Sequence, residues 1–379
     1  MDVASVVEPQ FALAHARGPQ GAEWGRLAFD CTAQLGDLAG TANLGFLYVT
    51  DALAADLPAI VAFLKRTTSI ADWVGSIGIG VLAGADEYFD EPAMALLAAQ
   101  LPPDGHRLFA GSPDEPDMRE TAGWAARIGA PVGIVHADPR MPDLPGAVET
   151  LARDTASFLI GGLTSSRGAM DQVAARVVRG GLSGVLLAPG MTVLSGLTQG
   201  CSPIGPARTV TAGRENVVFE IDDRSALDVF KEDIGEVLAR RLEQVGGTIH
   251  VAFPVAGSDT GDYVVRNLIG IDPARGWLAV AGEITVGEPM LFVRRDRDAA
   301  ERDLVRMLAG LRRRLSGPPR AGLYFSCIAR GRNLFGPNSA ELAIIRRELG
   351  DVPLAGLFCN GEISRDRLYS YTGVLALFV

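Results

Sequence analysis

The sequence predicts an α/β fold, of the α+β type, built from two similar halves that each hold a mixed, largely antiparallel β-sheet covered by helices. Three observations support this prediction. Short apolar runs of strand length alternate along the whole chain with segments of helical periodicity. The 379 residues exceed a typical single core, and 48% of them are hydrophobic, enough for a large folded interior. The pattern of residues 131–188 also recurs in residues 321–379.

This recurrence indicates an internal duplication of a strand–helix–strand–strand unit. The alternative explanation is chance, because any Gly- and Ala-rich α/β chain can contain segments with similar patterns. If the duplication is real, the two segments superpose and their loops face each other around one pocket. We divide the chain into domains 1–222 and 223–379. The glycines that correspond are Gly133 with Gly322, Gly162 with Gly356, and Gly184 with Gly373.

The first half begins with a Gly- and Ala-rich stretch of weak periodicity, and regular elements follow it. Acidic, Pro-rich residues 112–117 and turn-rich residues 198–206 are expected to be loops. We expect helices over 22–34, 53–64, 91–101 and 143–154. We expect strands over 43–50, 72–82, 106–110, 131–136, 157–163, 181–188, 191–197 and 216–222.

Three glycines interrupt the strand expected over 72–82. Gly75, Gly78 and Gly80 have the spacing Gly-x-x-Gly-x-Gly, the reverse of the dinucleotide-binding order, and no helix follows them directly. Glycines inside a strand favour a bulge or a close backbone approach. We therefore expect packing glycines here and no nucleotide site.

The second half starts with a long helix, expected over 226–244, that joins the two halves. Four strands follow, then a helix over 298–315 and a final strand–helix–strand–strand series. We expect Asn338 to cap the last helix, over 339–349, with Glu341 completing a capping box. The four strands are expected over 248–255, 263–269, 277–280 and 289–294.

The charge balance argues against several classes of partner. The net charge of −10 disfavours nucleic acid and anionic membrane surfaces. No apolar run reaches the length of a membrane span, and the N-terminus does not have the pattern of a secretion signal. The four scattered cysteines form no CxxC pair, which argues against a disulfide scaffold and a structural zinc site. We expect a cytoplasmic protein.

Polar residues follow two strand-like runs near the C-terminus. Cys327, Arg330 and Arg332 follow the first run, and Asn360 and Glu362 follow the second. One helix connects the two runs, and a strand–helix–strand crossover within one sheet makes its strands parallel. The carboxyl ends of both strands then meet at one edge, where ligands of open α/β sheets bind. We therefore expect these residues to form a site.

This stretch closely resembles the C-terminal part of the FIST family of bacterial sensory domains. The Phe-Ser-Cys-x-x-Arg-Gly-Arg-x-Leu-Phe-Gly pattern at 325–336 and the Leu-Ala-Gly-x-Phe-x-Asn-Gly-Glu-Ile pattern at 354–363 carry the resemblance. The Gln-Gly-Cys-x-Pro-Ile-Gly run at 199–205 also recurs in that family. The resemblance implies a signal-transduction module that binds a small ligand, such as an amino acid. The sequence shows no kinase, cyclase, methyl-accepting or DNA-binding segment, so we expect output through a signalling partner or a conformational change read in trans. We expect no cofactor, and the sequence leaves a homo-oligomer open.

Two interpretations of the charged residues remain open. Arg330 and Arg332 could bind a carboxylate while Glu362 binds an ammonium group, so that together they recognise a zwitterion. Alternatively, Glu362 pairs with Arg330 or Arg365 and only fixes the loops. Cys201, in its Pro- and Gly-rich loop, is expected to close the pocket from the other half.

An enzyme and a haem sensor are the alternative functions. An enzyme would use Cys327 or Glu362 on a small substrate. Cys327 could be a nucleophile whose pKa a nearby arginine lowers, but the sequence shows no general base. Some nitric-oxide sensors belong to the family that this chain resembles, and His136, at a strand end, is the best candidate for an axial haem ligand. No haem-attachment motif is present, and we expect the protein to purify colourless.

Overall fold

The computed structural model describes residues 8–129, 131–242, 245–258 and 261–379, and it divides into two compact units. Unit 1 contains the chain up to Thr198, Asp303–Leu368 and Thr372–Val379. Unit 2 contains Gln199–Arg302 and the short segment Tyr369–Tyr371. Among the described helices, none combines the length and the apolar character that a membrane crossing requires.

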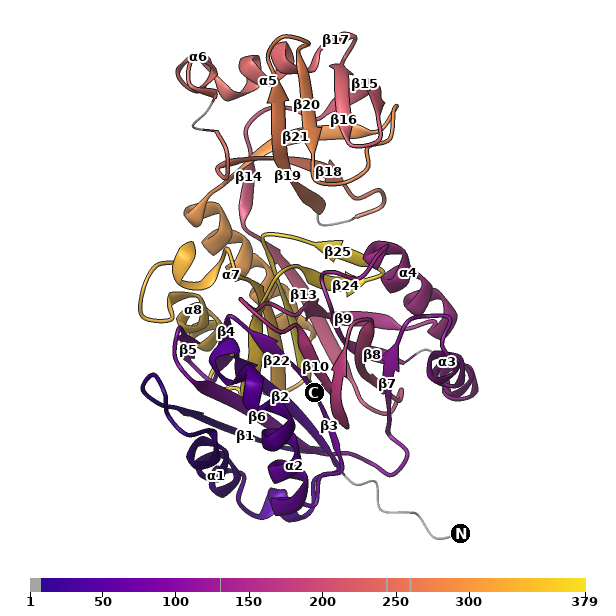
Figure 1. Ribbon diagram of the computed structural model, residues 1–379, viewed down its shortest axis with the longest axis vertical. Helices are drawn as coiled ribbons and strands as arrows, with labels where there is room; N and C mark the ends of the chain where they lie inside the picture. The colour runs from indigo at the N-terminus through magenta and orange to yellow at the C-terminus, as the bar shows by residue number, and fades with distance from the viewer. Residues whose placement is uncertain (1–7, 130, 243–244, 259–260) are drawn as a thin grey trace. The chain divides into compact units, whose positions relative to one another are not determined.

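Unit 1 consists of three repeats with the same order of elements: an edge strand, a helix, an inner strand, a second helix, a second inner strand, a two-stranded hairpin and a return strand (Figure 1). The first repeat comprises β1 (Gln10–Arg17), α1 (Trp24–Gln34), β2 (Leu44–Thr50), α2 (Leu57–Thr67), β3 (Asp72–Gly78), β4 (Gly80–Ala83), β5 (Asp86–Phe89) and β6 (Ala93–Gln100). The second comprises β7 (His106–Gly111), α3 (Pro116–Ile128), β8 (Val132–Ala137), α4 (Leu144–Thr155), β9 (Phe158–Leu163), β10 (Asp171–Ala174), β11 (Arg176–Arg179) and β12 (Leu182–Leu187). The third comprises β13 (Val193–Gln199), α7 (Arg297–Arg314), β22 (Ala321–Cys327), α8 (Ala340–Leu349), β23 (Leu354–Cys359), β24 (Glu362–Arg365), β25 (Arg367–Tyr369) and β26 (Thr372–Phe378).

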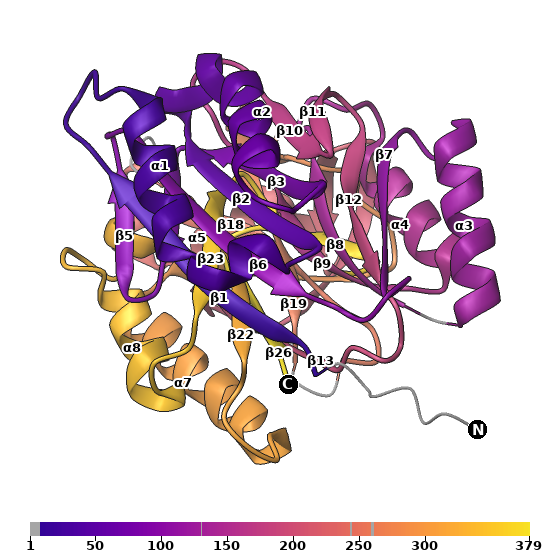
Figure 2. The same cartoon turned by 90° about the horizontal axis from the view of Figure 1, so that it is seen from below.

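The three repeats exchange their hairpins around a closed ring. Each six-stranded sheet has the order edge strand, return strand, first inner strand, second inner strand, and then the hairpin of another repeat. Thus β10 pairs with β3, β24 with β9, and β4 with β23. Figure 2 shows the helices of the three repeats on the outside, at α1 and α2, at α3 and α4, and at α7 and α8. The inner faces of all three sheets contribute to one apolar core.

A glycine at the same position of each second inner strand permits the close packing of the two inner strands. Gly75, Gly161 and Gly356 lie opposite residues 47, 135 and 324 in the three parallel pairs. A Cβ atom at these glycines would lie only 1.7, 1.8 and 1.8 Å from the carbonyl oxygen of the facing residue. No side chain fits in that space. The packing role expected for Gly75 is therefore confirmed.

The expected equivalence of residues 131–188 and 321–379 is confirmed by their strand order, but the duplication is part of a triplication. In both segments the first inner strand is parallel to the second and antiparallel to the return strand. The segment from β2 to β6 has the same pairing. Two of the three glycine correspondences expected from the sequence were wrong. Gly161, and not Gly162, corresponds to Gly356. Gly184 corresponds to Leu375 and not to Gly373, because Gly184 and Leu375 pair with the equivalent residues 135 and 324.

The helix expected over 91–101 is wrong, because this segment is the return strand β6. Every residue from Ala93 to Ala99 is buried, so this strand is apolar at nearly every position. In such a continuous apolar run, apolar residues also occur at helical spacing, and periodicity does not separate a strand from a helix. The Ala-rich composition favours a helix locally, but burial on both faces of the sheet overrides that preference. The loop expected over 112–117 is also wrong at its end, because α3 begins at Pro116, a residue that helices favour in their first turn.

Two further helix predictions need correction. The helix expected over 226–244 ends at Ile234, because Gly235 follows with a φ of 80°. Helix α6 is a separate short turn after this glycine. Residues 243–244 lie outside the described residues. The capping box is absent as well. Ser339 precedes α8 in a left-handed conformation without a side-chain cap, and Glu341 points into the protein instead.

Unit 2 is an antiparallel barrel. Its strands pair in the order β21, β15, β16, β20, β19 and β18, and β18 pairs with β21 to close the ring. Helix α5 packs on the apolar interior of this barrel. The elements are β14 (Cys201–Pro203), β15 (Arg208–Arg214), β16 (Val217–Ile221), β17 (Arg224–Ser225), α5 (Ala226–Ile234), α6 (Glu236–Ala239), β18 (Ile249–Pro254), β19 (Tyr263–Asp272), β20 (Trp277–Val280) and β21 (Pro289–Arg295).

The packing glycines generate a stability prediction. Replacing Gly161 or Gly356 with alanine forces two inner strands apart and should lower the free energy of unfolding by about 3 kcal/mol. Urea denaturation monitored by circular dichroism measures this loss. Gly168→Ala is the matched control, because a Cβ atom there meets nothing within 4 Å. Equal stability of the control and the Gly161→Ala protein would contradict the packing role.

Candidate functional site

The centre of unit 1 holds one aromatic side chain from each first inner strand. Tyr48, His136 and Phe325 occupy equivalent positions, and their ring centroids lie 5.6, 6.1 and 6.0 Å apart. The Nε2 atom of His136 lies 3.2 Å from the hydroxyl oxygen of Tyr48. Burial lowers the pKa of His136 to about 3, so the imidazole is neutral at physiological pH.

His136 does not fit the role of a haem ligand. Its side chain has no exposed surface, its Nε2 atom faces Tyr48, and aromatic rings pack on both sides of it. A haem needs an open face above the ligating nitrogen, and the packed centre offers none at this residue.

Arg330, which the sequence suggested as a ligand-binding residue, forms a buried ion pair with Glu341 of α8. Both side chains are fully buried. The Nε and Nη2 atoms of Arg330 lie 2.8 and 2.7 Å from Oε1 of Glu341. Tyr324 donates a hydrogen bond to the same oxygen at 2.6 Å. The other oxygen, Oε2, accepts from the Ser326 hydroxyl at 3.1 Å and from the backbone N–H of Gly331 at 2.9 Å.

This ion pair fixes the loop that follows β22. The carboxylate of Glu341 is bound from the strand, through Tyr324, and from the loop, through Arg330 and Gly331. The guanidinium of Arg330 also lies 5.0 Å from the ring centroid of Phe335, further along the same loop. Arg330 is therefore a structural residue that ties the loop to α8.

Glu362 and Cys327 lie together in the interior, as the sequence suggested, but not on an open surface. Glu362 is fully buried and accepts two hydrogen bonds through Oε2, from the backbone N–H of Thr372 at 3.2 Å and from its hydroxyl at 2.7 Å. Burial raises the pKa of Glu362 to about 8, although Thr372, the charge of Arg330 and the thiol of Cys327 all oppose the rise. The carboxyl group is therefore protonated at neutral pH. Burial also raises the pKa of Cys359, so that thiol is a poor nucleophile.

Arg332 and Asn360 point to solvent, away from this interior cluster. Arg332 forms an ion pair with Asp90, and its guanidinium lies 4.3 Å from the ring centroid of Phe89. Asp90 also binds Arg167 at 3.0 Å. Asn360 is exposed. The structure thus brings Cys327, Arg330 and Glu362 together, and it separates Arg332 and Asn360 from them.

Cys201 lies in unit 2. It is buried in a small apolar cluster with residues of β18, β19 and β21, and its carbonyl oxygen accepts a hydrogen bond from the hydroxyl of Tyr263. Within the barrel, Cys201 is part of the packing.

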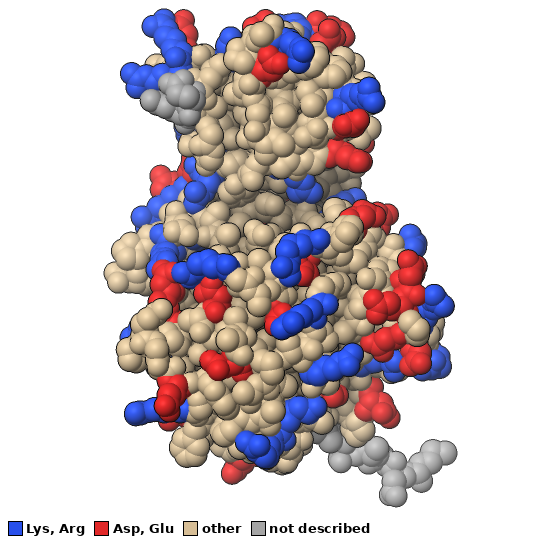
Figure 3. All heavy atoms as spheres, viewed as in Figure 1, with Lys and Arg blue, Asp and Glu red and all other residues tan. Residues whose placement is uncertain are grey.

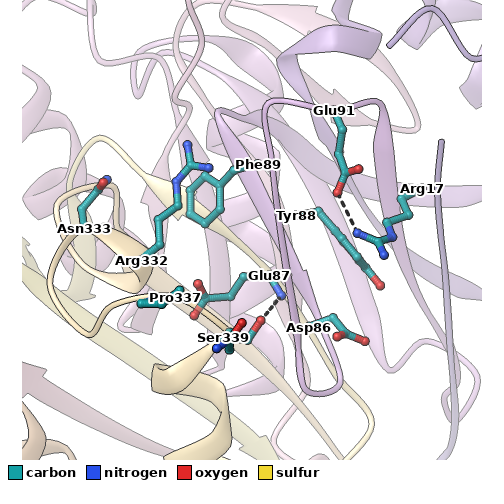
Figure 4. A pocket seen from close by; sticks show the side chains of 11 residues that line it. Arg17, Asp86, Glu87, Tyr88, Phe89, Glu91, Arg332, Asn333, Pro337 and Ser339 are labelled. Carbon is teal, nitrogen blue, oxygen red and sulfur yellow. Dashed lines mark hydrogen bonds and ion pairs between the residues drawn. The ribbon is translucent and has the colours of Figure 1, made fainter. Parts of the chain in front are cut away.

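A pocket of about 730 Å³ in unit 1 lies between the β4–β5 hairpin and the loop after β22, and we call it the hairpin pocket (Figure 4). Its volume is within the range of small-molecule sites. The hairpin lies in the expected domain 1–222, and the loop lies in the expected domain 223–379. The residues that line the pocket are Arg17, Asp86, Glu87, Tyr88, Phe89, Glu91, Arg332, Asn333, Pro337, Asn338 and Ser339.

The wall of the hairpin pocket carries charges of both signs beside aromatic rings. Arg332 lies over the ring of Phe89, and its side chain remains 45% exposed. Elsewhere in the wall, Arg17 of β1 and Glu91, which lies between β5 and β6, form an ion pair of 3.4 Å (Figure 4). Such a wall suits a small molecule that is itself charged.

Glu87 is the unusual residue of this pocket, and the sequence analysis did not identify it. Its backbone N–H donates to the Ser339 hydroxyl at 2.9 Å (Figure 4). Its Oε1 atom is inaccessible to solvent and has no hydrogen-bond partner among the described residues. Burial and the nearby carboxylate of Glu341 raise the pKa of Glu87 to about 8, against the opposing effect of Arg332. No local pattern identifies it, because β5 has only the four residues Asp86–Phe89, which do not alternate, and the sequence does not reveal the pairing of β4 with β23.

The rest of the described surface offers no comparable feature for nucleic acid or metal. On the face shown in Figure 3, acidic and basic side chains of unit 1 are interspersed. No group of three or more His, Cys, Asp and Glu residues in the described part of the chain is arranged to hold a metal ion.

The buried ion pair predicts a large loss of stability in single variants. Arg330→Ala leaves Glu341 buried without its partner and should lower the free energy of unfolding by about 3–5 kcal/mol. Arg332→Ala, which removes an exposed pair, should cost less than about 1 kcal/mol. Urea denaturation measures these two variants, the single variant Glu341→Ala and the double variant Arg330→Ala/Glu341→Ala. If the stability loss of the double variant equals the sum of the losses of Arg330→Ala and Glu341→Ala, the two residues do not depend on each other.

The buried carboxyl group of Glu362 predicts a pH dependence of stability. A carboxyl group whose pKa rises from 4.5 to about 8 on folding stabilises the folded state below pH 4.5, and this contribution is lost as the pH rises through 8. Glu362→Gln, which cannot ionise, should therefore lose less stability than the wild type between pH 6 and pH 9. The control is Glu301→Gln, because Glu301 forms only an exposed ion pair. Parallel pH profiles for the wild type and Glu362→Gln would refute the assignment.

Comparison with known proteins places this architecture in a family. The FIST N domain matches residues 43–224 and the FIST C domain matches residues 226–365. The family division falls between β17 and α5, inside unit 2, so each family segment contributes to both compact units.

Relatives of similar length occur in mycobacteria. The uncharacterized protein Rv0628c of Mycobacterium tuberculosis is 31% identical over 342 residues, which cover 84% of this chain and 87% of the relative. The uncharacterized protein Mb0898c of Mycobacterium bovis is 30% identical over 337 residues, which cover 81% and 82%. A solved structure of Thermotoga maritima PurL with FGAR aligns at 12% identity over 98% of this chain and 72% of that chain, but its TM-score of 0.25 supports no argument. The two domain matches extend over most of the sequence, and the chain therefore belongs to the FIST family.

Proposed function

We propose that this protein is a sensory module of a signalling system and that it binds a small charged molecule, such as an amino acid, in the hairpin pocket. FIST domains are consistent with a role in sensing and signal transduction. The binding position follows from the pocket, whose two walls come from the two family segments. This position retains the expected site between the sequence halves, but it replaces most of the expected residues.

One observation carries the proposal: a pocket of small-molecule size has an accessible guanidinium and a carboxyl group in its wall. Arg332 can exchange Asp90 for a carboxylate of the ligand at low cost, because exposed ion pairs are weak. Phe89 gives the ligand an apolar surface next to that charge. Rigid support comes from the Arg330–Glu341 pair, which holds the loop behind Arg332.

An enzyme that uses Cys327 and Glu362 has less support. Both side chains are buried, and the carboxyl group of Glu362 carries a proton at neutral pH. A protonated acid cannot serve as a general base. We further propose a reducing compartment such as the cytoplasm, because the four cysteines are thiols, and a partner protein that reads the bound state in trans.

A ligand screen tests the proposed function. Thermal unfolding is measured with the twenty amino acids, with aliphatic amines and with dicarboxylates. A compound at one hundred times its Kd should add about 2.7 kcal/mol of stability. Arg332→Ala should weaken binding of the best compound at least tenfold, about 1.4 kcal/mol, while the free protein keeps its stability.

Arg153→Ala is the matched control, because Arg153 is an exposed arginine that pairs only with nearby residues of α4. It should bind the same compound with unchanged affinity. Equal loss of affinity in both arginine variants, or unchanged affinity of Arg332→Ala, would place the binding site outside the hairpin pocket.

A further inference from the structure

Glu87 is placed to recognise a particular chemical group. It lies on the edge strand β5, and Figure 4 shows its carboxyl group in the pocket between Pro337 and the stem of Arg332. Its Oε1 atom is buried and unpartnered among the described residues. On its other side the carboxyl group approaches Gly331, where a Cβ atom would lie 3.2 Å from Oε2. The glycine lets the carboxyl group enter, and the loop then holds it in place.

Charged groups from each neighbouring element act on this carboxyl group. Glu341 of α8 is ion-paired with Arg330 and repels a second negative charge, and burial acts in the same direction. The backbone N–H and the charge of Arg332 favour ionisation but are outweighed, and the pKa of Glu87 is about 8. On its own strand, Asp86 adds another acid to the pocket wall. In the empty pocket at neutral pH, Glu87 therefore carries a proton.

A ligand that bears an ammonium group changes this balance. An ammonium that approaches Glu87 from the pocket supplies the positive charge that the ionised carboxylate needs, and a small shift of the side chain toward the ligand brings its unpartnered Oε1 atom into hydrogen-bond distance. A neutral or anionic group offers no such compensation, because a buried ionised carboxylate without a partner is costly. The pocket geometry thus selects ligands by the amine group.

We propose that Glu87 is the specificity residue of the hairpin pocket, that it binds an aliphatic ammonium group, and that binding releases the proton of Glu87. In this exchange the protonated carboxyl group and the ammonium give an ion pair and one free proton, so charge and atoms balance. The inference rests on the proposed function, because it assigns a role within the same pocket. It adds a dependence on pH: affinity for amines rises with pH up to about 8 and then levels off.

Calorimetry with simple probes tests this inference. n-Butylamine is titrated into the protein at pH 7 in phosphate and in HEPES, whose ionisation enthalpies differ and neither of which is a primary amine, and n-butanol and butyrate serve as neutral and anionic analogues. We expect n-butylamine to bind best and to release close to one proton. Glu87→Gln should abolish the proton release and weaken binding of n-butylamine at least tenfold, with little effect on butyrate. Glu301→Gln, which alters an exposed glutamate outside the pocket, is the control and should keep the proton release.

The outcomes separate the inference from the proposed function. Binding of n-butylamine without proton release, equal binding by Glu87→Gln, or preference for butyrate would overturn the inference and leave the pocket as a binding site. An independent check is the carbon-13 carboxyl shift of Glu87 in the free protein, which should titrate near pH 8; ionisation already at pH 6 would also overturn the inference. If neither these probes nor the screened compounds bind, the proposed function itself fails.

Discussion

The buried ion pair between Arg330 and Glu341 is the interaction on which the pocket depends. Burial removes both charges from water, and this desolvation is unfavourable. Packed hydrophobic residues often stabilise a core as well as a buried ion pair does. Here the carboxylate receives hydrogen bonds from the strand and from the loop, so it fixes one against the other. Its carboxylate also adds to burial, the larger cause, in raising the pKa of the nearby Glu87 to about 8. One interaction thus shapes the pocket wall and contributes to its electrostatics.

The three repeats show that this interaction belongs to the third repeat alone. Tyr324 and Ser326 face Glu341, and the equivalent positions in the other repeats are Leu47 and Val49, and Val135 and Ala137. Those four side chains pack into apolar clusters with their own helices. The shared packing glycines therefore build the frame, and a few polar replacements in one repeat add a site. This division is common, because folds host functions through local sites.

Much of the fold could be predicted from the sequence. Most strands and helices follow from periodicity, and the echo between 131–188 and 321–379 reflects a real equivalence of strand order. The sequence analysis did not identify the first repeat for two reasons. The Ala-rich sequence of β6 predicts a helix, and β1 lies in a stretch of weak periodicity. The insertion of unit 2 between β13 and α7 is a long-range property that periodicity does not report.

The site was harder to predict than the fold. Strand ends correctly located Cys327, Arg330 and Glu362 near each other, but burial, which the sequence does not give, made them interior residues. Arg330 and Arg332 are two residues apart, and only the backbone course through Gly331, at a φ of 48°, decides that one is buried and the other exposed. Glu87 enters the site through pairing of hairpin β4–β5 with β23, which joins residues more than 250 positions apart.

Hydrogen–deuterium exchange with a bound compound tests the central claim most directly. The wild-type protein is compared with and without the compound that stabilises it most. The account predicts slower exchange in the hairpin residues 86–91 and in the loop residues 331–339, with little change elsewhere in unit 1. Protection confined to the strand ends at 359–362, or to the barrel of unit 2, would contradict the claim that the hairpin pocket is the binding site.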